Sequence, residues 1–254
     1  MSEPAAPEAR QLEGVLFDYG ETLVHFKRPD EALAAADAAI VDLLAASGKP
    51  APSPTTLRGV ILDRVEREVL EHQGAGELAE ISVVVAARRA YADAGFDLDD
   101  NLLDELLRIE QEAWWQGAHV DPAAAPLLDA LRRDGVRVGL CSNAPYRVRS
   151  LHAQLAHVGL DTHLDAVTFS AEIGWRKPSP AIFSAALHAL GTEASGTVMV
   201  GDSEVHDVGG AHAAGMRAVL LRRSGTRARS AADAVIAALD QLTGALRSIG
   251  LYWG

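Results

Sequence analysis

The sequence predicts an α/β fold, with a doubly wound parallel sheet and an inserted subdomain made only of helices. Short apolar runs, such as residues 14–17, end directly in polar residues and glycine, as buried parallel strands do. Helical patterns separate most of these runs, which is the order of elements in a doubly wound sheet. Residues 30–115 show helical periodicity throughout, and this block interrupts the alternation once.

Length, charge and cysteine content limit the possible partners. The 254 residues suffice for one α/β domain with an inserted subdomain. The formal net charge of -12 leaves no basic surface, so we expect neither nucleic acid nor a membrane as a partner. Cys141 is the only cysteine, which precludes an intrachain disulfide and favours a cytoplasmic protein. Residues 1–11 lack the apolar stretch of a signal peptide and are expected to form a disordered tail.

The elements follow from periodicity and from helix-breaking residues. The first strand covers residues 14–17, and the core domain is expected to comprise residues 12–28 and 119–254. The helical insert, residues 29–118, is expected to contain four helices, the last of which begins at Asp99 or Asp100 as N-cap. These four helices are predicted at 30–46, 54–72, 77–94 and 99–117. The elements expected after the insert are helix 122–134, strand 136–141, helix 148–158, strand 166–170, helix 180–190, strand 198–200, helix 208–214, strand 218–221 and helix 231–247.

Polar side chains follow the predicted strands at their carboxyl ends, where ligands bind in such sheets. Asp18 follows the first strand, Ser142 and Asn143 follow the second, Lys177 lies in the loop beyond the third, and Asp202 follows the fourth. Carboxylate oxygens suit Mg²⁺, which usually takes one or two protein carboxylates and completes its shell with water and substrate oxygens. The set therefore predicts a magnesium site that also binds phosphate.

The chemistry expected at this edge is phosphoryl transfer. The carboxylate of Asp18 can attack phosphorus and form an aspartyl-phosphate, which divides one difficult displacement into two. The hydroxyl of Ser142 and the ammonium of Lys177 can donate to the phosphoryl oxygens. Structural alternatives remain open: the aspartates could cap turns, the Ser142–Asn143 pair could cap the next helix, and Lys177 could be a solvated loop cation.

Four segments, FDYGETL, LCSNA, RKPSPAIF and VMVGDSEVHD, resemble in order and spacing the four motifs of the haloacid dehalogenase superfamily. The resemblance implies a Rossmann-like core with a helical cap, and a hydrolase that acts on a small phosphorylated metabolite. It implies a cap that closes over the site. We expect a monomer or a homodimer. By position in these motifs, Asp18 is nucleophile and metal ligand, Gly20 a ligand through its carbonyl, Asp202 the third ligand, Asp207 an acid that supports these ligands, and Thr22, Ser142, Asn143 and Lys177 the groups that orient or bind phosphate.

Gly20 departs from the family pattern. Phosphatases of this superfamily usually have a second aspartate there, which protonates the leaving group and then activates water. General acid-base help of this kind contributes roughly 100- to 10,000-fold in rate. Its loss favours substrates whose leaving group needs little protonation, such as acyl or anomeric phosphates. Glu21, one residue out of register, His25 or a residue of the cap could substitute.

Three further functions remain open at this point. One is haloacid dehalogenation, in which an aspartate attacks carbon without a metal, although GDSEVHD retains the metal-type fourth motif. Another is a pseudoenzyme that binds a phosphorylated ligand without turnover, which Gly20 would explain. Phosphomutase activity ranks last, because its members generally resemble the pattern with the second aspartate. Substrate identity does not follow from the sequence.

Overall fold

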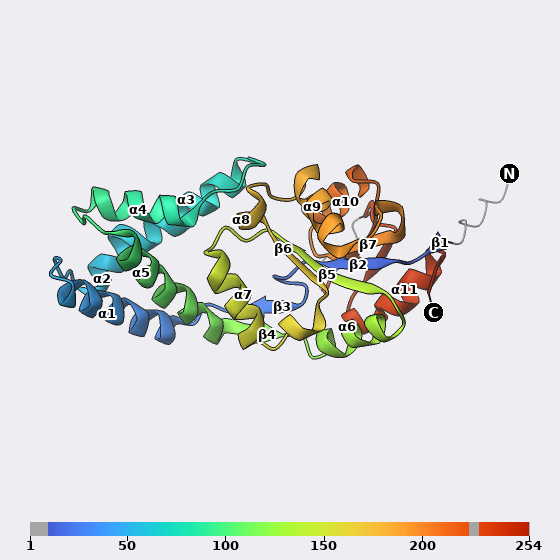
Figure 1. The fold of residues 1–254 in the computed structure, drawn as a ribbon, viewed down its shortest axis with the longest axis horizontal. Helices are drawn as coiled ribbons and strands as arrows, with labels where there is room; N and C mark the ends of the chain where they lie inside the picture. The colour runs from blue at the N-terminus through green and yellow to red at the C-terminus, as the bar shows by residue number, and fades with distance from the viewer. Residues whose placement is uncertain (1–9, 224–228, 254) are drawn as a thin grey trace. The chain divides into compact units, whose positions relative to one another are not determined.

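The computed structural model describes residues 10–223 and 229–253, and its contacts divide the chain into two compact units (Figure 1). The core unit contains residues up to His25, Val120–Asn143 and the chain from Leu160 onward. The helical unit contains Phe26–His119 and Ala144–Gly159. The core unit holds every residue for which the sequence predicts a catalytic, phosphate-binding or metal-binding role.

The core unit is built on a six-stranded sheet with the order β6-β5-β2-β7-β8-β9, and all the strand pairs are parallel. β2 (Gly14–Phe17) lies in the middle, between β5 (Arg137–Ser142) and β7 (Thr197–Gly201). All four residues of β2 are buried, as expected for a parallel strand covered on both faces. The outer strands are β6 (Ala166–Phe169), β8 (Arg217–Leu221) and β9 (Ala234–Ile236).

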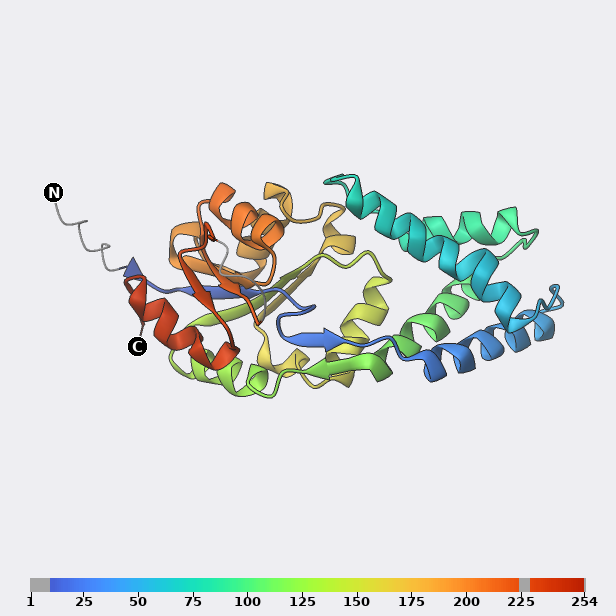
Figure 2. The ribbon, with the colours of Figure 1, turned by 180° about the vertical axis from the view of Figure 1, so that it is seen from behind.

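Helices cover both faces of this sheet, as Figures 1 and 2 show. α9 (Pro180–Leu190) and α10 (Gly210–Ala213) lie on one face, and α6 (Ala124–Arg133) and α11 (Leu242–Ser248) lie on the other. Phe183 of α9 packs with Leu16 of β2 in one buried cluster. The predicted doubly wound α/β fold is therefore confirmed.

The local sequence explains where α9 begins and ends. The hydroxyl of Ser179 accepts a hydrogen bond from the backbone N–H of Ala181, and Pro180 occupies the first helical position, where no N–H is needed. Gly191 ends the helix with a φ of 72°, a conformation that glycine adopts without steric cost. The start of α9 fixes the end of the loop that contains Lys177.

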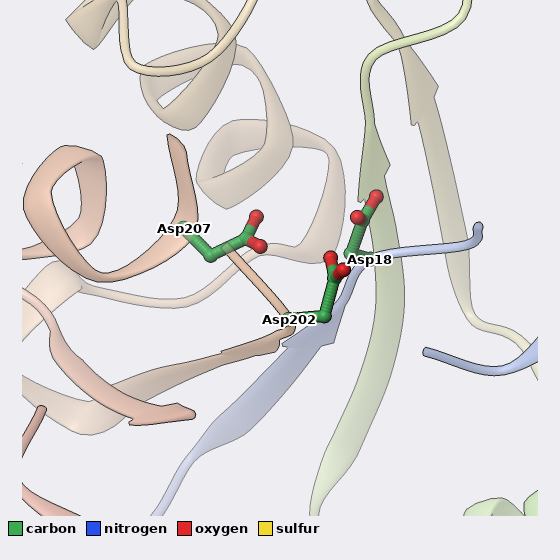
Figure 3. Close-up of side chains that lie close together, drawn as sticks. All are labelled: Asp18, Asp202 and Asp207. Atoms are coloured by element: carbon green, nitrogen blue, oxygen red, sulfur yellow. The ribbon is translucent and has the colours of Figure 1, made fainter. Parts of the chain in front are cut away.

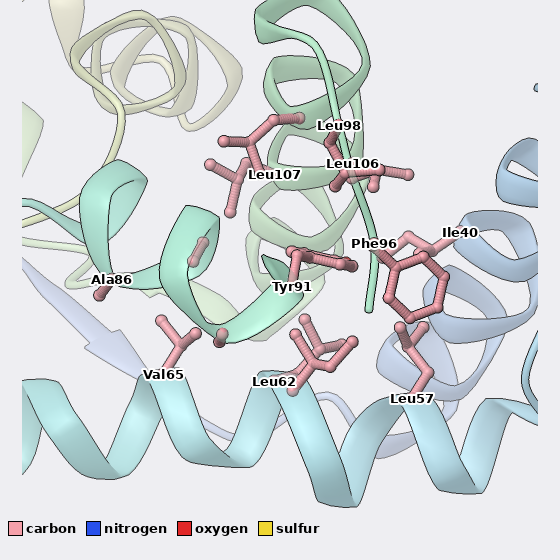
Figure 4. Close-up of a cluster of buried hydrophobic side chains, with 14 of the residues drawn as sticks. Ile40, Leu57, Leu62, Val65, Ala86, Tyr91, Phe96, Leu98, Leu106 and Leu107 are labelled. Carbon is pink, nitrogen blue, oxygen red and sulfur yellow. The ribbon is translucent and has the colours of Figure 1, made fainter. Parts of the chain in front are cut away.

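The helical unit packs its helices around an apolar cluster of its own. Figure 4 shows part of this cluster, in which Tyr91 lies among leucine and phenylalanine side chains. The rings of Tyr91 and Phe96 meet edge to face with centroids 5.9 Å apart. The helices of this unit are α1 (Asp30–Ala46), α2 (Pro54–Leu57), the π-helical segment Arg58–Leu62, α3 (Asp63–Gly74), α4 (Val83–Asp93), α5 (Asp100–Ala113), the 3₁₀ segment Trp114–Gly117 and α7 (Val148–His157).

Two contacts explain details of this unit. The carboxylate of Asp99 accepts from the N–H of Leu102, so Asp99 is the N-cap of α5, one of the two residues expected. The guanidinium of Arg147 donates to both carboxylate oxygens of Asp104 at 2.7 and 2.5 Å. This pair joins residues 144–159 to α5, although that segment lies within the core domain predicted from the sequence. The role of the helical unit as a cap stays a prediction.

The structure corrects two predicted elements and adds several short ones. The helix predicted at 77–94 begins only at Val83, where the hydroxyl of Ser82 accepts from the N–H of Val85 as N-cap. Residues 231–247 do not form one helix, because 234–236 is the edge strand β9 and α11 begins only at Leu242. The Ser142–Asn143 pair is not a helix cap, because α7 begins at Val148. The short elements absent from the sequence prediction are β1 (Arg10–Gln11), which pairs with β10 (Leu251–Tyr252), β3 (Val24–Phe26), which pairs with β4 (Ala118–Val120), α8 (Ser170–Ile173), the 3₁₀ segments Asp161–His163, Ala194–Gly196 and Leu239–Gln241, and the π-helical segment Glu204–Gly209.

Two expectations about the rest of the chain concern its tail and membranes. Residues 1–9 of the expected tail lie outside the described residues, whereas Gln11 belongs to β1. Among the described residues, no helix combines the length and the apolar character that crossing a bilayer requires.

Candidate active site

The site is assembled at the carboxyl ends of the three central strands. Asp18 follows β2, Ser142 ends β5 and Asp202 follows β7. In the sheet register Phe17 lies beside Leu140 on one side and Val200 on the other, so the three strand ends are neighbours. The predicted convergence of these side chains therefore has a simple cause in the strand order.

Three carboxylates meet at this edge. Asp18, Asp202 and Asp207 each offer an oxygen, and these oxygens all lie within 4.8 Å of one another. Figure 3 shows the carboxylate of Asp207 turned toward those of Asp18 and Asp202. Partial burial, together with the negative charges of Asp18 and Asp207, raises the pKa of Asp202 to about 6. Like charges held this close favour a bound cation.

Lys177 supplies a fixed positive charge beside two of these acids. Its side chain is only 1% exposed, and its Nζ lies 2.6 Å from Oδ1 of Asp207 and 3.0 Å from Oδ1 of Asp18. Burial alone would lower the pKa of Lys177, but the charges of Asp18 and Asp207 outweigh it and raise the pKa above its ordinary value. The ammonium is therefore charged at neutral pH.

The carboxylate of Asp18 is oriented by three donors. Its Oδ1 accepts from the N–H of Tyr19 at 2.8 Å, from the hydroxyl of Ser142 at 2.7 Å, and lies 3.0 Å from Nζ of Lys177. Within residues 10–223 and 229–253, Oδ2 has no hydrogen-bond partner. One oxygen thus fixes the side chain, and the other is available to a metal or to phosphorus.

Asn143 and Asp207 hold other parts of the site in place. The amide of Asn143 donates to the carbonyl of Lys177 at 3.1 Å and accepts from its N–H at 2.7 Å, which fixes the backbone of the lysine. Asp207 uses Oδ1 for Lys177 and accepts from the N–H of Ser203 with Oδ2 at 2.9 Å. Both oxygens of Asp207 are therefore engaged, as expected for the supporting role that the resemblance implies.

The remaining predicted residues, Thr22 and Gly20, lie in the turn after β2. Thr22 is fully buried, and its hydroxyl has no hydrogen-bond partner in the described part of the chain. Its carbonyl accepts from Nη2 of Arg223 at 2.8 Å, and the same Nη2 lies 2.9 Å from Oδ2 of Asp121. Gly20 forms an isolated bridge with Val24, which closes the turn.

Sequence reasoning missed two arginines near this edge. Arg223 lies in an arginine-rich stretch of the sequence, residues 222–229, and its contacts with Thr22 and Asp121 make it part of the turn. Arg227 of that stretch lies outside the described residues. Arg176, the neighbour of Lys177 in the sequence, is 5% exposed. Burial of a charged residue has no clear marker in a single sequence, so neither position could be recognised in advance.

Cys141 lies in the same strand as Ser142 and is fully buried. Burial raises the pKa of its thiol to about 12, so the thiol is protonated at neutral pH. Such an environment is typical of an inert, buried thiol.

The fold and the strand-end site define a class of α/β protein with three carboxylates and a buried lysine at the carboxyl edge of its sheet. Residues 12–215 match the family of haloacid dehalogenase-like hydrolases, and the chain belongs to that family. The resemblance inferred from the four sequence motifs is therefore confirmed.

Several relatives are named as phosphatases. The chain is 33% identical to a phosphoglycolate phosphatase of Cereibacter sphaeroides over 209 residues, which cover 82% of this chain and 84% of the relative. It is 38% identical to a phosphoglycolate phosphatase of Rhodospirillum rubrum over 124 residues, or 49% of this chain and half of the relative's length. It is 37% identical to a phosphoserine phosphatase of Thermus thermophilus over 102 residues, or 40% of each chain.

Solved structures with the same fold include both a phosphatase and a dehalogenase. A HAD phosphatase from Thermococcus onnurineus is 27% identical, with a TM-score of 0.63, over 92% of this chain and 98% of that one. A 2-haloacid dehalogenase from Pseudomonas syringae pv. Tomato DC3000 is 28% identical, with a TM-score of 0.67, over 93% of this chain and 99% of that one. The fold therefore does not by itself distinguish the two reactions.

Proposed function

We propose that this protein is a Mg²⁺-dependent phosphohydrolase that acts on a small phosphorylated metabolite through an aspartyl-phosphate at Asp18. The observation that supports the proposal most is the position of Nζ of Lys177, 3.0 Å from Asp18 and 2.6 Å from Asp207, with Asp202 in the same acidic cluster. A cation beside the nucleophile offsets the negative charge that a phosphoryl group brings.

The donor set at this edge fits magnesium. Asp18 and Asp202 supply carboxylate oxygens, and the family motif adds the carbonyl of Gly20. Two carboxylates, with water and substrate oxygens, are the ligands that Mg²⁺ usually takes. The ion would offset the charge of the phosphoryl group and of the two aspartates.

The residues of the chain divide the reaction between them. The free oxygen of Asp18 attacks phosphorus, the P–O bond to the leaving group breaks, and water then hydrolyses the aspartyl-phosphate. The Ser142 hydroxyl and the Lys177 ammonium lie at the attacking carboxylate and can donate to phosphoryl oxygens. Asn143 positions Lys177, and Thr22 offers a buried hydroxyl that is unpaired among the described residues.

The test is turnover of an aryl phosphate with and without Mg²⁺. We expect hydrolysis that is lost when the metal is chelated and that falls to background in Asp18→Asn. Asp161→Asn is the matched control, because it makes the same change at an exposed site in the same unit and should retain wild-type activity. Activity that survives in Asp18→Asn would exclude the proposed nucleophile.

Gly20 leads to a proposal about the leaving group. Without an aspartate at this position, we expect acyl and anomeric phosphates to be hydrolysed faster than alkyl phosphates. Gly20→Asp should raise the rate for alkyl phosphates by roughly 100-fold or more, the contribution of general acid catalysis. Steady-state rates on the two substrate classes measure this effect. Equal wild-type rates, with no gain in Gly20→Asp, contradict it.

Haloacid dehalogenation remains the second candidate, favoured by the similarity to the Pseudomonas enzyme. A dehalogenase of this family needs no metal, so chelation separates the two reactions. Release of halide from a 2-haloacid in the presence of a chelator would support the second candidate. The binding protein without turnover gains no support from the relatives named above, which are phosphatases.

A further inference from the structure

Arg176 is a buried cation without a counter-ion in the described part of the chain. Arg176 is 5% exposed. Its Nε and Nη1 are buried and have no hydrogen-bond partner among the described residues. No ion pair joins it to a carboxylate among residues 10–223 and 229–253. Charged side chains are rarely buried unless they are paired, and each unsatisfied buried donor needs an explanation such as a bound ion.

The position of Arg176 connects it with the catalytic edge. It directly precedes Lys177, and consecutive Cα atoms are ~3.8 Å apart. Its charge also acts on His206, whose pKa is lowered first by burial and then by Arg176. His206 belongs to the segment Glu204–Gly209, which also contains Asp207.

The acids of the site do not neutralise Arg176. Asp207 gives Oδ1 to Lys177 and Oδ2 to the N–H of Ser203, and Oδ1 of Asp18 is shared by Lys177, Ser142 and Tyr19. The oxygens that remain, those of Asp202 and Oδ2 of Asp18, are assigned to the proposed magnesium ion and to phosphorus. An anion that enters with the substrate is the natural partner for a second buried cation.

We propose that Arg176 binds a second anionic group of the substrate, a carboxylate or a further phosphate, close to the phosphoryl group held at Lys177. The inference rests on the proposed phosphohydrolase function and narrows its substrate class to small phosphate esters with a second negative charge. A planar guanidinium matches both groups, because its parallel N–H bonds meet two oxygens at once. A chain with a net charge of -12 needs such local cations to attract a dianionic ligand.

The first experiment compares matched substrates. Phosphoglycolate and hydroxyethyl phosphate have the same phosphate and chain length, but only phosphoglycolate has a carboxylate. In Arg176→Gln we expect kcat/KM for phosphoglycolate to fall about 10- to 100-fold, mainly through KM, because a charged hydrogen-bonded contact contributes on this scale. The rate with hydroxyethyl phosphate should hardly change. A sugar bisphosphate and the corresponding monophosphate form the second arm, which shows whether the second group is a phosphate.

Two further variants serve as controls. One tests whether the charge of Arg176 suffices without its planar shape, and the other tests whether loss of any arginine has the same effect. Arg176→Lys retains the charge but loses the fork, so it should lose part of the discrimination between the paired substrates. Arg137→Gln makes the same change as Arg176→Gln at an exposed arginine, which begins β5 at the opposite end of the strand from Ser142. It should leave both rates unchanged. Equal losses on both substrates in Arg176→Gln would overturn the proposal.

The Tm of the ligand-free protein distinguishes a binding role of Arg176 from a structural one, because the two roles predict opposite changes in Tm. Arg176→Met removes a buried charge that has no partner among the described residues, so Tm should stay constant or rise. If Arg176 only supported the fold, Tm would fall and the substrate ratio would not change. That combination overturns the proposal.

Binding measured in the Asp18→Asn variant, where turnover is blocked, tests the anion subsite independently of the proposed phosphohydrolase activity. Calorimetry should show that phosphoglycolate binds more weakly after Arg176→Gln is added, whereas hydroxyethyl phosphate binds equally. This result supports the anion subsite even if the wild type hydrolyses neither ester. Equal binding of phosphoglycolate with and without Arg176 refutes it.

Discussion

At the scale of single residues, the charge balance around Lys177 gives the first prediction. Lys177→Met leaves the buried Asp207 without its cation, and breaking a buried pair in this way costs about 3–5 kcal/mol of unfolding free energy. Adding Asp207→Asn should restore part of this loss, because the unpaired charge is then removed. Urea unfolding of the single and double variants measures the coupling. Additive losses would contradict the assigned ion pair.

Glu21 gives the second prediction, which concerns the backbone. Its φ of 57° lies in the left-handed region, where a Cβ atom costs about 1–2 kcal/mol. Glu21→Gly should therefore stabilise the protein by about 1 kcal/mol, less the entropy that glycine adds to the unfolded chain. Glu21→Ala is the matched control, since it removes the carboxylate but keeps Cβ, and it should give no gain. Denaturant midpoints distinguish the two variants, and equal midpoints refute the strain.

These residues also show how far the sequence can define the site. Asp18, Ser142 and Asp202 were foreseeable because each follows or ends a buried strand, and parallel strands align their carboxyl ends. The sequence did not reveal that Asn143 holds the backbone of Lys177 rather than standing free. It also did not reveal that Arg176 is buried, because that depends on how the loop after α8 folds.

At the scale of elements, the turn from β7 into the segment Glu204–Gly209 requires a residue without a side chain. A Cβ atom on Gly201 would lie 2.2 Å from Cγ of Asp207, which is too close for any real contact. Gly201→Ala should therefore displace Asp207 and lower phosphatase activity at least as far as Asp207→Asn does. Gly209→Ala is the control, because its nearest atom lies 3.6 Å away. Full activity in Gly201→Ala contradicts the packing described.

The segment 231–247 shows why some elements were not predictable. Its alanines favour a helix, but 234–236 pairs in parallel with β8 and buries Ile236 while Val235 is 47% exposed. The N–H of Ala218 donates to the Asp233 carboxylate at 2.8 Å, which aligns the new strand. Pairing with the preceding strand thus outweighs local helix propensity. The helix at Asp30–Ala46, which depends on its own periodicity, was predicted with its observed bounds.

At the scale of the whole molecule, the acidic cluster Asp18, Asp202 and Asp207 links the stability of the fold to pH and to metal binding. Asp202 has a pKa raised from 3.8 to about 6, so in this window the folded chain binds more protons than the unfolded chain. Its contribution to stability is therefore greatest at low pH and falls as pH rises from about 4 to about 6. Above about pH 6 the carboxylate is ionised in both states, and the repulsion from Asp18 and Asp207 is fully present.

Magnesium should reverse this loss, because it binds the ionised carboxylates and competes with the proton. We expect added Mg²⁺ to raise Tm strongly at about pH 7.5 and little at about pH 5, with the apparent Kd weakening about tenfold per pH unit below the pKa. Asp202→Asn has no carboxylate to titrate, so its smaller Mg²⁺ effect should be independent of pH over this range. Thermal unfolding across a pH series, with Ca²⁺-free buffers and a chelator blank, measures both effects. An equal Tm gain at the two pH values in the wild type would show that Asp202 is not a ligand, and it would leave Asp18 as the only carboxylate of the proposed magnesium site.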